Sequence, residues 1–206
     1  MRTSPKKSFS LFFGILFLLI LTAILIPPDL LKAASRQCIW EGVEKIIAIG
    51  DLHGDYDHFV TILKNEDINL VAEKDNKLHW IGGKTHLVQI GDVMDRGDKA
   101  RDIFDLIKTL EKEAEKAGGQ VHMLIGNHEE INILERVFEY GEDYINVEQF
   151  KSFLSESYKK RKEREFKKRT EDGGDINTEW KNLMKTDDGQ REYYDNFNLY
   201  YGRWIA

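Results

Sequence analysis

Three short polar strings, each beginning with a glycine, combine side chains that can bind divalent cations. They are Gly50-Asp51-Leu52-His53-Gly54, Gly91-Asp92-Val93-Met94-Asp95-Arg96-Gly97 and Gly126-Asn127-His128-Glu129. Asp51 and His53 are two residues apart, so in an extended chain both side chains can reach one ion. The Asp92 carboxylate has two oxygens and can bridge two ions, and Asn127 offers an amide oxygen. We therefore expect a site for two divalent metal ions about 3.5–4 Å apart.

The donor set narrows the choice of metal. A mixture of carboxylate, amide and imidazole ligands suits manganese, iron or zinc better than calcium. Each string alone has an ordinary explanation, because a Gly-Asp pair is usually a turn or a helix cap and a single histidine is usually a surface or packed residue. At average residue usage, however, each string would arise by chance on the order of once in a thousand chains of this length. The three together favour a metal site.

Short apolar segments precede the three strings and are typical of buried parallel strands. They cover residues 45–49, 87–90 and 121–125. Between them, the spacing of apolar residues predicts helices over 55–66 and 100–116, and a hairpin over 70–81 that turns at Asp75-Asn76. Alternating strands and helices predict an α/β fold with right-handed crossovers. All three strand ends then lie at one edge of the sheet, where such folds bind ligands.

Composition limits the remaining possibilities. The chain has 206 residues, enough for one domain with an appendage. Its net charge of −6 argues against nucleic acid as a partner. Cys38 is the single cysteine, which excludes a disulfide within the chain and a cysteine-rich metal centre. Any metal must therefore bind to histidine, carboxylate or amide groups.

The N-terminal region has the composition of a membrane segment. Residues 9–26 contain no charge and follow Arg2, Lys6 and Lys7. They are either a signal peptide, with a small-residue cleavage site at Ala33-Ala34-Ser35, or an uncleaved anchor. The anchor is favoured because the apolar region of a removable signal usually has only about 7–15 residues. The preceding positive charges place the remainder outside the cytoplasm, tethered to the cell membrane or secreted into a space such as the periplasm.

The three strings resemble the signature blocks of the calcineurin-like metallophosphoesterases, and their DRG and NHE forms resemble the PPP-type protein phosphatases. The segments 80–83 and 201–204 look like those of the bacterial and plastid Shewanella-like branch. This resemblance is strong over about residues 45–140 and weak in the last few residues. It implies a metallophosphoesterase-type α/β sandwich that binds two divalent ions. Asp51, His53 and Asp92 would hold one ion, and Asp92 with Asn127 the other.

The same resemblance implies a reaction. A metal-bound hydroxide would attack the phosphorus of a phosphomonoester, such as one on a phosphoprotein. His128 would protonate the leaving oxygen, Asp95 would orient His128, and Arg96 would bind the phosphoryl oxygens. Two alternatives stay open. One is a dinucleoside polyphosphate hydrolase, which shares related blocks but is disfavoured outside the cytoplasm. The other is a catalytically inactive fragment that binds a metal ion or serves as a membrane-bound interaction module.

The chain departs from this family in one respect. Complete members have two further metal-binding histidines downstream, whereas no histidine follows His128 here. The segment 200–206 is an aromatic run that we expect to lack a terminal helix. We therefore expect residues 39–206 to be an incomplete phosphoesterase domain, behind an N-terminal segment and connector over residues 1–38.

A charged helical insertion is expected over about residues 135–199. Its stretch 151–170 has nine basic and three acidic residues. These charges could bind a phosphorylated partner or membrane phosphates, but a solvent-exposed helix is the simpler and favoured interpretation. Gly173-Gly174 should end that helix, and a second short helix should cover residues 176–184.

Overall fold

The structure is a computed structural model that describes residues 39–141, 143–171 and 173–205. The expected membrane or signal segment within residues 1–38 lies outside the described residues. Among the described helices, none combines the length and the apolar character needed to cross a membrane. The described residues from Val43 onward form one compact unit.

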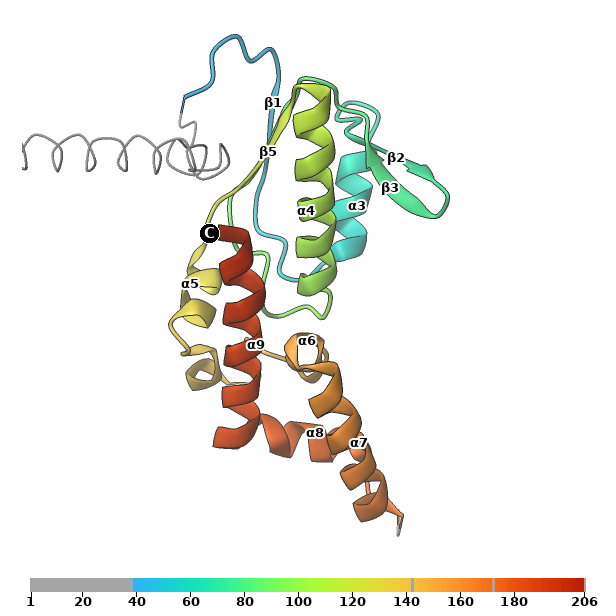
Figure 1. Ribbon diagram of the computed structural model, residues 1–206, viewed down its shortest axis with the longest axis vertical. Helices are drawn as coiled ribbons and strands as arrows, with labels where there is room; N and C mark the ends of the chain where they lie inside the picture. Colours follow the sequence, from blue (N-terminus) through green and yellow to red (C-terminus); the bar gives the residue numbers. More distant parts are fainter. Residues whose placement is uncertain (1–38, 142, 172, 206) are drawn as a thin grey trace, which may run out of the picture. The chain divides into compact units, whose positions relative to one another are not determined.

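A three-stranded parallel sheet carries the three polar strings (Figure 1). Its order is β1 (Ile46–Ile49), β4 (His86–Gln89) and β5 (Gln120–Met123), and both neighbouring pairs are parallel. The expected α/β architecture with a parallel sheet is therefore confirmed. Each strand has four paired residues. The third strand was expected to extend to residue 125, but β5 ends at Met123, where its pairing with β4 ends.

Helix α4 (Ala100–Ala117) connects β4 to β5 and contacts β5, β3 and helix α3 (Tyr56–Lys64). The side chains that it buries recur at helical spacing, among them Ile103, Ile107 and Leu110. Gly118 ends it in the left-handed region at φ 80°, which glycine adopts without steric cost. Both helices therefore agree closely with the sequence pattern.

The expected hairpin forms a separate two-stranded antiparallel sheet. Strands β2 (Val71–Lys74) and β3 (Lys77–Trp80) pair through a turn at Asp75 and Asn76, whose φ angles are 52° and 58°. Two consecutive positive φ angles match the twist of a two-residue hairpin, and asparagine and aspartate tolerate them well.

The rest of the described chain is helical. Its elements are α5 (Asn127–Ile133), η1 (Val137–Tyr140), α6 (Val147–Phe153), α7 (Glu156–Thr170), α8 (Ile176–Met184) and α9 (Asp187–Ile205). The stretch expected as one helix over 151–170 is divided, because Leu154 adopts an extended backbone between α6 and α7. Helix α8 has the expected bounds.

The expectation that the chain ends without a terminal helix is wrong. Residues 187–205 form α9, which runs beside α5 (Figure 1). Tyr193, Phe197 and Tyr201 recur every four residues, and all three are buried. Tyr201, in the final aromatic run, thus continues the buried face of an amphipathic helix.

One face of the parallel sheet keeps apolar side chains accessible to solvent. Ile46 is 62% exposed, and Ile90 and Leu124 are each 49% exposed. The core lies on the other face, where Ile49, Leu87 and Val121 are buried.

Candidate metal centre

Side chains from all three strings meet at the carboxyl edge of the parallel sheet. One potential ligand atom each from His53, Asp92 and His128 lies within 4.8 Å of the other two. His53 follows β1, Asp92 follows β4, and His128 is in the first turn of α5 after β5. The structure thus brings together residues that are up to 75 positions apart in the chain.

Backbone hydrogen bonds join the first string to the second. The amides of Leu52 and His53 donate to the Asp92 carbonyl at 2.9 and 3.0 Å, and Gly54 N–H donates to Val93 O at 2.8 Å. Close approach requires glycine at Gly97, where an added Cβ would lie 2.2 Å from the His53 carbonyl oxygen. The glycines of the strings therefore permit contact between the loops.

Four residues of the strings have left-handed backbones. The φ angles are 46° at His53, 55° at Asp92, 67° at Asp95 and 66° at Arg96. Such conformations cost about 1–3 kcal/mol each for residues other than glycine, and they persist where surrounding contacts hold them. Their concentration here is typical of a functional site.

Glu129 provides much of that support. Its side chain is fully buried and accepts hydrogen bonds from the amides of Asp92 at 2.7 Å, Val93 at 2.9 Å and Met94 at 3.1 Å. It also accepts from Gly126 N–H at 2.9 Å. Burial raises the pKa of the Glu129 carboxyl, and these amide donors oppose the rise. Glu129 is three residues after Gly126, a position from which acidic side chains bond back to the start of a helix.

His53 is oriented with one ring nitrogen toward the site. Its Nδ1 lies 2.9 Å from the Met94 carbonyl oxygen, so Nδ1 carries the proton and donates it. Nε2 is then the unprotonated nitrogen, as metal ligation requires. Nη1 of Arg96 lies 2.8 Å from this Nε2, and Nη2 of Arg96 lies 3.5 Å from Nε2 of His128. A cationic group already occupies the space beside both imidazoles, so the donor set fits a cation.

His128 and Asp95 form a buried pair. His128 Nδ1 and Asp95 Oδ2 are 2.9 Å apart, and the two residues are 2% and 0% exposed. The Asp95 carboxylate accepts a hydrogen bond from Nδ1 of His128. The other ring nitrogen, Nε2, lies on the side of Arg96 and the candidate metal centre. The resemblance implies that Asp95 orients His128, and the structure places the two side chains within hydrogen-bond distance.

Asp95 is held by residues that the sequence reasoning missed. Gln149 Nε2 donates to Asp95 Oδ1 at 2.6 Å, and Asn132 Nδ2 donates to both carboxylate oxygens at 3.1 and 3.2 Å. The Tyr193 hydroxyl in turn donates to Asn132 Oδ1 at 2.7 Å. Burial raises the pKa of the Asp95 carboxyl, and hydrogen bonds from Gln149, His128 and Asn132 oppose the rise.

Two further residues connect the second string to the helical region. Arg96 N–H donates to the Tyr144 carbonyl at 2.7 Å, and the Tyr144 ring stacks on His128 with centroids 4.9 Å apart. Asn146 Nδ2 donates to the carbonyl oxygens of Arg96 at 3.2 Å and Gly97 at 2.9 Å. No motif in the sequence marked either residue.

The other expected metal ligands lie beside the cluster with fewer contacts. Asp51 is exposed, and its Oδ2 lies 3.8 Å from His53 Nε2. Asn127 is the first residue of α5 and is also exposed.

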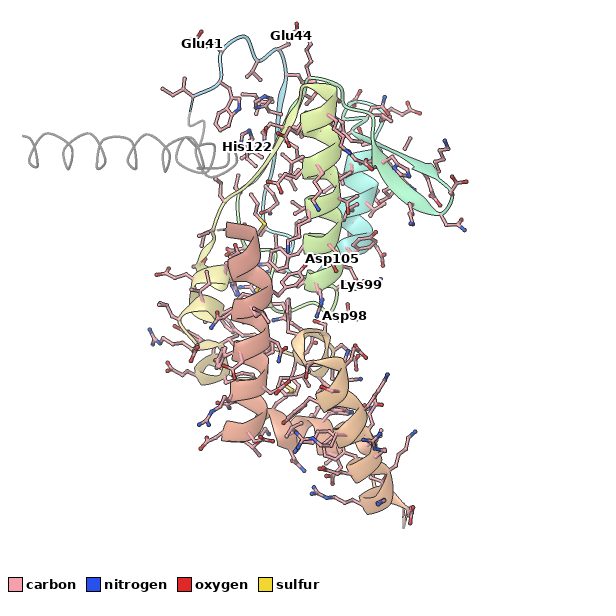
Figure 2. All side chains as sticks on the ribbon, in the orientation of Figure 1. Glu41, Glu44, Asp98, Lys99, Asp105 and His122 are labelled. Atoms are coloured by element: carbon pink, nitrogen blue, oxygen red, sulfur yellow. The ribbon has the colours of Figure 1, made fainter. Side chains whose placement is uncertain are left out.

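The remaining histidines contact partners elsewhere. His58 lies 2.6 Å from Asp55, His79 lies 3.0 Å from Glu113, and His86 and His122 lie 3.0 Å from each other. Figure 2 shows His122 on β5, away from the helix α5 that carries His128.

Comparison with known proteins identifies the family of this chain. Residues 44–203 match the sequence profile of the family described as calcineurin-like phosphoesterase. Shewanella-like protein phosphatase 2 of Arabidopsis thaliana is 40% identical over 97 residues, which are 47% of this chain and 24% of that protein. Shewanella-like protein phosphatase 1 of Plasmodium berghei (strain Anka) is 40% identical over 115 residues, which are 56% and 28% of the two chains.

Among solved structures, a cold-active protein-tyrosine phosphatase of a psychrophilic Shewanella species is 37% identical. The match covers 45% of this chain and 26% of that one, with a TM-score of 0.40. This chain therefore matches only about a quarter of the length of these relatives. Because the family profile spans residues 44–203, and those residues include the cluster of His53, Asp92 and His128, the chain belongs to the calcineurin-like phosphoesterase family.

Proposed function

We propose that this chain hydrolyses phosphomonoesters with the help of divalent metal ions, and that phosphoproteins are among its substrates. The observation that carries the proposal is the convergence of His53, Asp92 and His128 within 4.8 Å, beside the guanidinium of Arg96. The family and the protein phosphatases among its relatives support the same reaction class.

Four residues are the proposed metal ligands. They are Asp51, His53, Asp92 and Asn127, whose oxygen and imidazole donors suit manganese, iron or zinc. When bound, such ions supply Lewis-acid neutralisation of the phosphoryl charge and lower the pKa of bound water. In this proposal Asp92 is shared between the two ions, and Asn127 contributes an oxygen to the second.

Arg96 and His128 are the residues proposed to contact the substrate, and Asp95 is proposed to position His128. The planar guanidinium of Arg96 matches two phosphoryl oxygens. His128 presents Nε2 to the site and can pass a proton to the leaving oxygen. Asp95 is a positioning residue, because it holds Nδ1 of that ring and so keeps Nε2 directed at the site.

Turnover of p-nitrophenyl phosphate by the full chain tests the proposal. We expect Mn²⁺-dependent hydrolysis that a chelator removes. His128→Asn should lower kcat by about 10²- to 10⁴-fold, the usual contribution of a proton-transferring side chain. His58→Asn is the matched control, because His58 lies on α3 and contacts the helix-capping residue Asp55, and this variant should retain the wild-type rate.

Metal-stimulated hydrolysis that is equal in His128→Asn and His58→Asn would refute the assigned roles. Metal binding without any hydrolysis would instead identify an inactive metal-binding chain. A rate with diadenosine tetraphosphate far above that with phosphomonoesters would identify a dinucleoside polyphosphate hydrolase.

A further inference from the structure

Helix α7 divides its basic side chains between two sides. One side packs against α8 (Figure 1), where the buried ring of Phe166 contacts that of Trp180 with centroids 5.1 Å apart. The basic residues on this side form ion pairs: Lys159 with Glu156, Lys162 with Asp188, and Arg169 with Glu179. Their charges are therefore balanced by carboxylates of the same chain.

The other side of α7 carries a basic stripe, which consists of the exposed residues Arg161, Arg164, Lys167 and Lys168. At 3.6 residues per turn, these positions fall within about 120° of the helix circumference. The guanidinium carbon of Arg161 lies 4.9 Å from the centroid of the Tyr158 ring. In the described part of the chain, no carboxylate forms an ion pair with any of the four. The stripe thus presents four positive charges to solvent, in a protein whose net charge is −6.

This arrangement is unfavourable for the helix itself. Like charges three or four residues apart on a helix repel each other and destabilise it. Arg164 has Arg161 three residues before it, and Lys167 and Lys168 three and four residues after it. A local arrangement that lowers stability is typical of a surface that is kept for function.

We propose that the basic stripe binds an acidic segment of a partner protein, whose aspartate or glutamate carboxylates lie beside the four cations. An arginine guanidinium can bind one carboxylate through two parallel hydrogen bonds, and a lysine ammonium attracts it as a point charge. Charge complementarity with the stripe therefore supplies the attraction. This inference concerns binding and does not depend on the proposed hydrolysis of phosphomonoesters.

The surroundings of the stripe favour an extended peptide over a membrane surface. Glu163 and Glu165 flank Arg164 in the sequence, so they lie about 100° to either side of it around the helix. A flat anionic bilayer would bring its phosphates close to these carboxylates as well, whereas a peptide that lies along the stripe avoids them. The two large apolar side chains of α7, Tyr158 and Phe166, are buried, so they are not available to insert into lipid.

Fluorescence anisotropy of labelled hexaglutamate, titrated with the full chain, tests the proposal. We expect saturable binding at an ionic strength of about 0.1 M, and weaker binding as added salt screens the charges. Hexaglutamine has the same backbone without the charges and should not bind. Arg164→Glu should weaken hexaglutamate binding at least about fivefold, because it removes one exposed ionic contact and adds a repulsive charge.

Two comparisons separate this loss of binding from other effects of the substitution. Arg164→Glu replaces repulsive spacings on α7 with attractive ones, so the midpoint of its thermal unfolding should not fall below that of the wild type. Lys74→Glu makes the same change of charge at an exposed position of β2 and should bind hexaglutamate as the wild type does.

Three results would overturn the proposal. The first is the absence of saturable hexaglutamate binding by the wild type. The second is an equal loss of binding in Arg164→Glu and Lys74→Glu, which would indicate attraction by overall charge. The third is binding to phosphatidylglycerol vesicles that Arg164→Glu abolishes, in a protein that does not bind hexaglutamate, which would identify a membrane surface as the partner.

Discussion

The buried carboxylate of Glu129 joins the second and third strings by accepting hydrogen bonds from their backbone amides. It has no role in the proposed reaction. In Glu129→Gln, an amide nitrogen replaces one acceptor oxygen, and the buried amides of Asp92, Val93 and Met94 can no longer all be satisfied. We expect the free energy of unfolding to fall by at least about 2 kcal/mol, because each of these hydrogen bonds ends on a charged group. Urea denaturation measures this change.

Glu130→Gln is the control for that substitution. Glu130 occupies the next position of α5 and is exposed. Its replacement should change stability by no more than about 0.5 kcal/mol. Equal effects of the two substitutions would show that Glu129 acts only through the general preference for acidic residues at the start of a helix.

At the level of single residues, the sequence predicted the members of the strings but not their supports. Asp51, His53, Asp92 and His128 stand in local patterns whose chemistry can be read directly. Gln149 reaches Asp95 across 54 positions, and Tyr193 reaches Asn132 across 61. Such contacts depend on how α6 and α9 pack, which no local spacing encodes.

The junction between β5 and α5 gives a prediction at the level of elements. An added Cβ at Gly126 would lie 2.2 Å from Asp92 Oδ1 and 2.4 Å from Asp92 N. Gly126→Ala must therefore displace the second string. We expect a loss of about 1–3 kcal/mol of stability, the usual cost of overpacking, together with weaker metal binding.

Gly50→Ala is the matched substitution, at the end of β1. A Cβ there meets nothing within 4 Å, and Gly50 does not need a positive φ. This variant should keep wild-type metal affinity and stability in thermal unfolding. A Gly126→Ala variant with unchanged metal affinity would mean that the approach of the two loops is not needed for the site.

Some helices and strands can be located from the sequence and others cannot, and the difference has a physical cause. The three strands, α3, α4 and the hairpin combine strong apolar periodicity with glycine, aspartate or asparagine at their ends, so they could be located from local signals. The final aromatic run lacks such an end signal, so its sequence alone does not predict a helix. Its helical spacing becomes informative only once Tyr193, Phe197 and Tyr201 are seen on one buried face.

For the whole molecule, the buried tyrosines predict alkaline instability. Burial raises the pKa of Tyr194 to about 12 and that of Tyr193 well above its ordinary value of 10. The unfolded chain loses these protons near pH 10, whereas the folded chain retains them. Their contribution is therefore complete below pH 10 and falls as the pH rises toward about 12.

Urea unfolding as a function of pH tests this expectation. Stability should decline progressively above about pH 10, the model-peptide pKa of tyrosine. The decline should be shallower in Tyr194→Phe, which removes one ionisable group from the helical core. A stability that is flat up to about pH 12, or an identical decline in Tyr194→Phe, would contradict the assignment.

The most direct test of the account is the binding of Mn²⁺ to the full chain and to its Asp92→Asn variant, measured by titration calorimetry. Asp92 is the ligand expected to contact both ions, so its charge matters more than that of any other residue in the site. We predict saturable binding of two equivalents by the wild type, and loss of at least one equivalent in Asp92→Asn. Identical isotherms for the two proteins, or no binding by the wild type, would contradict the claim that the three strand ends form a divalent metal centre.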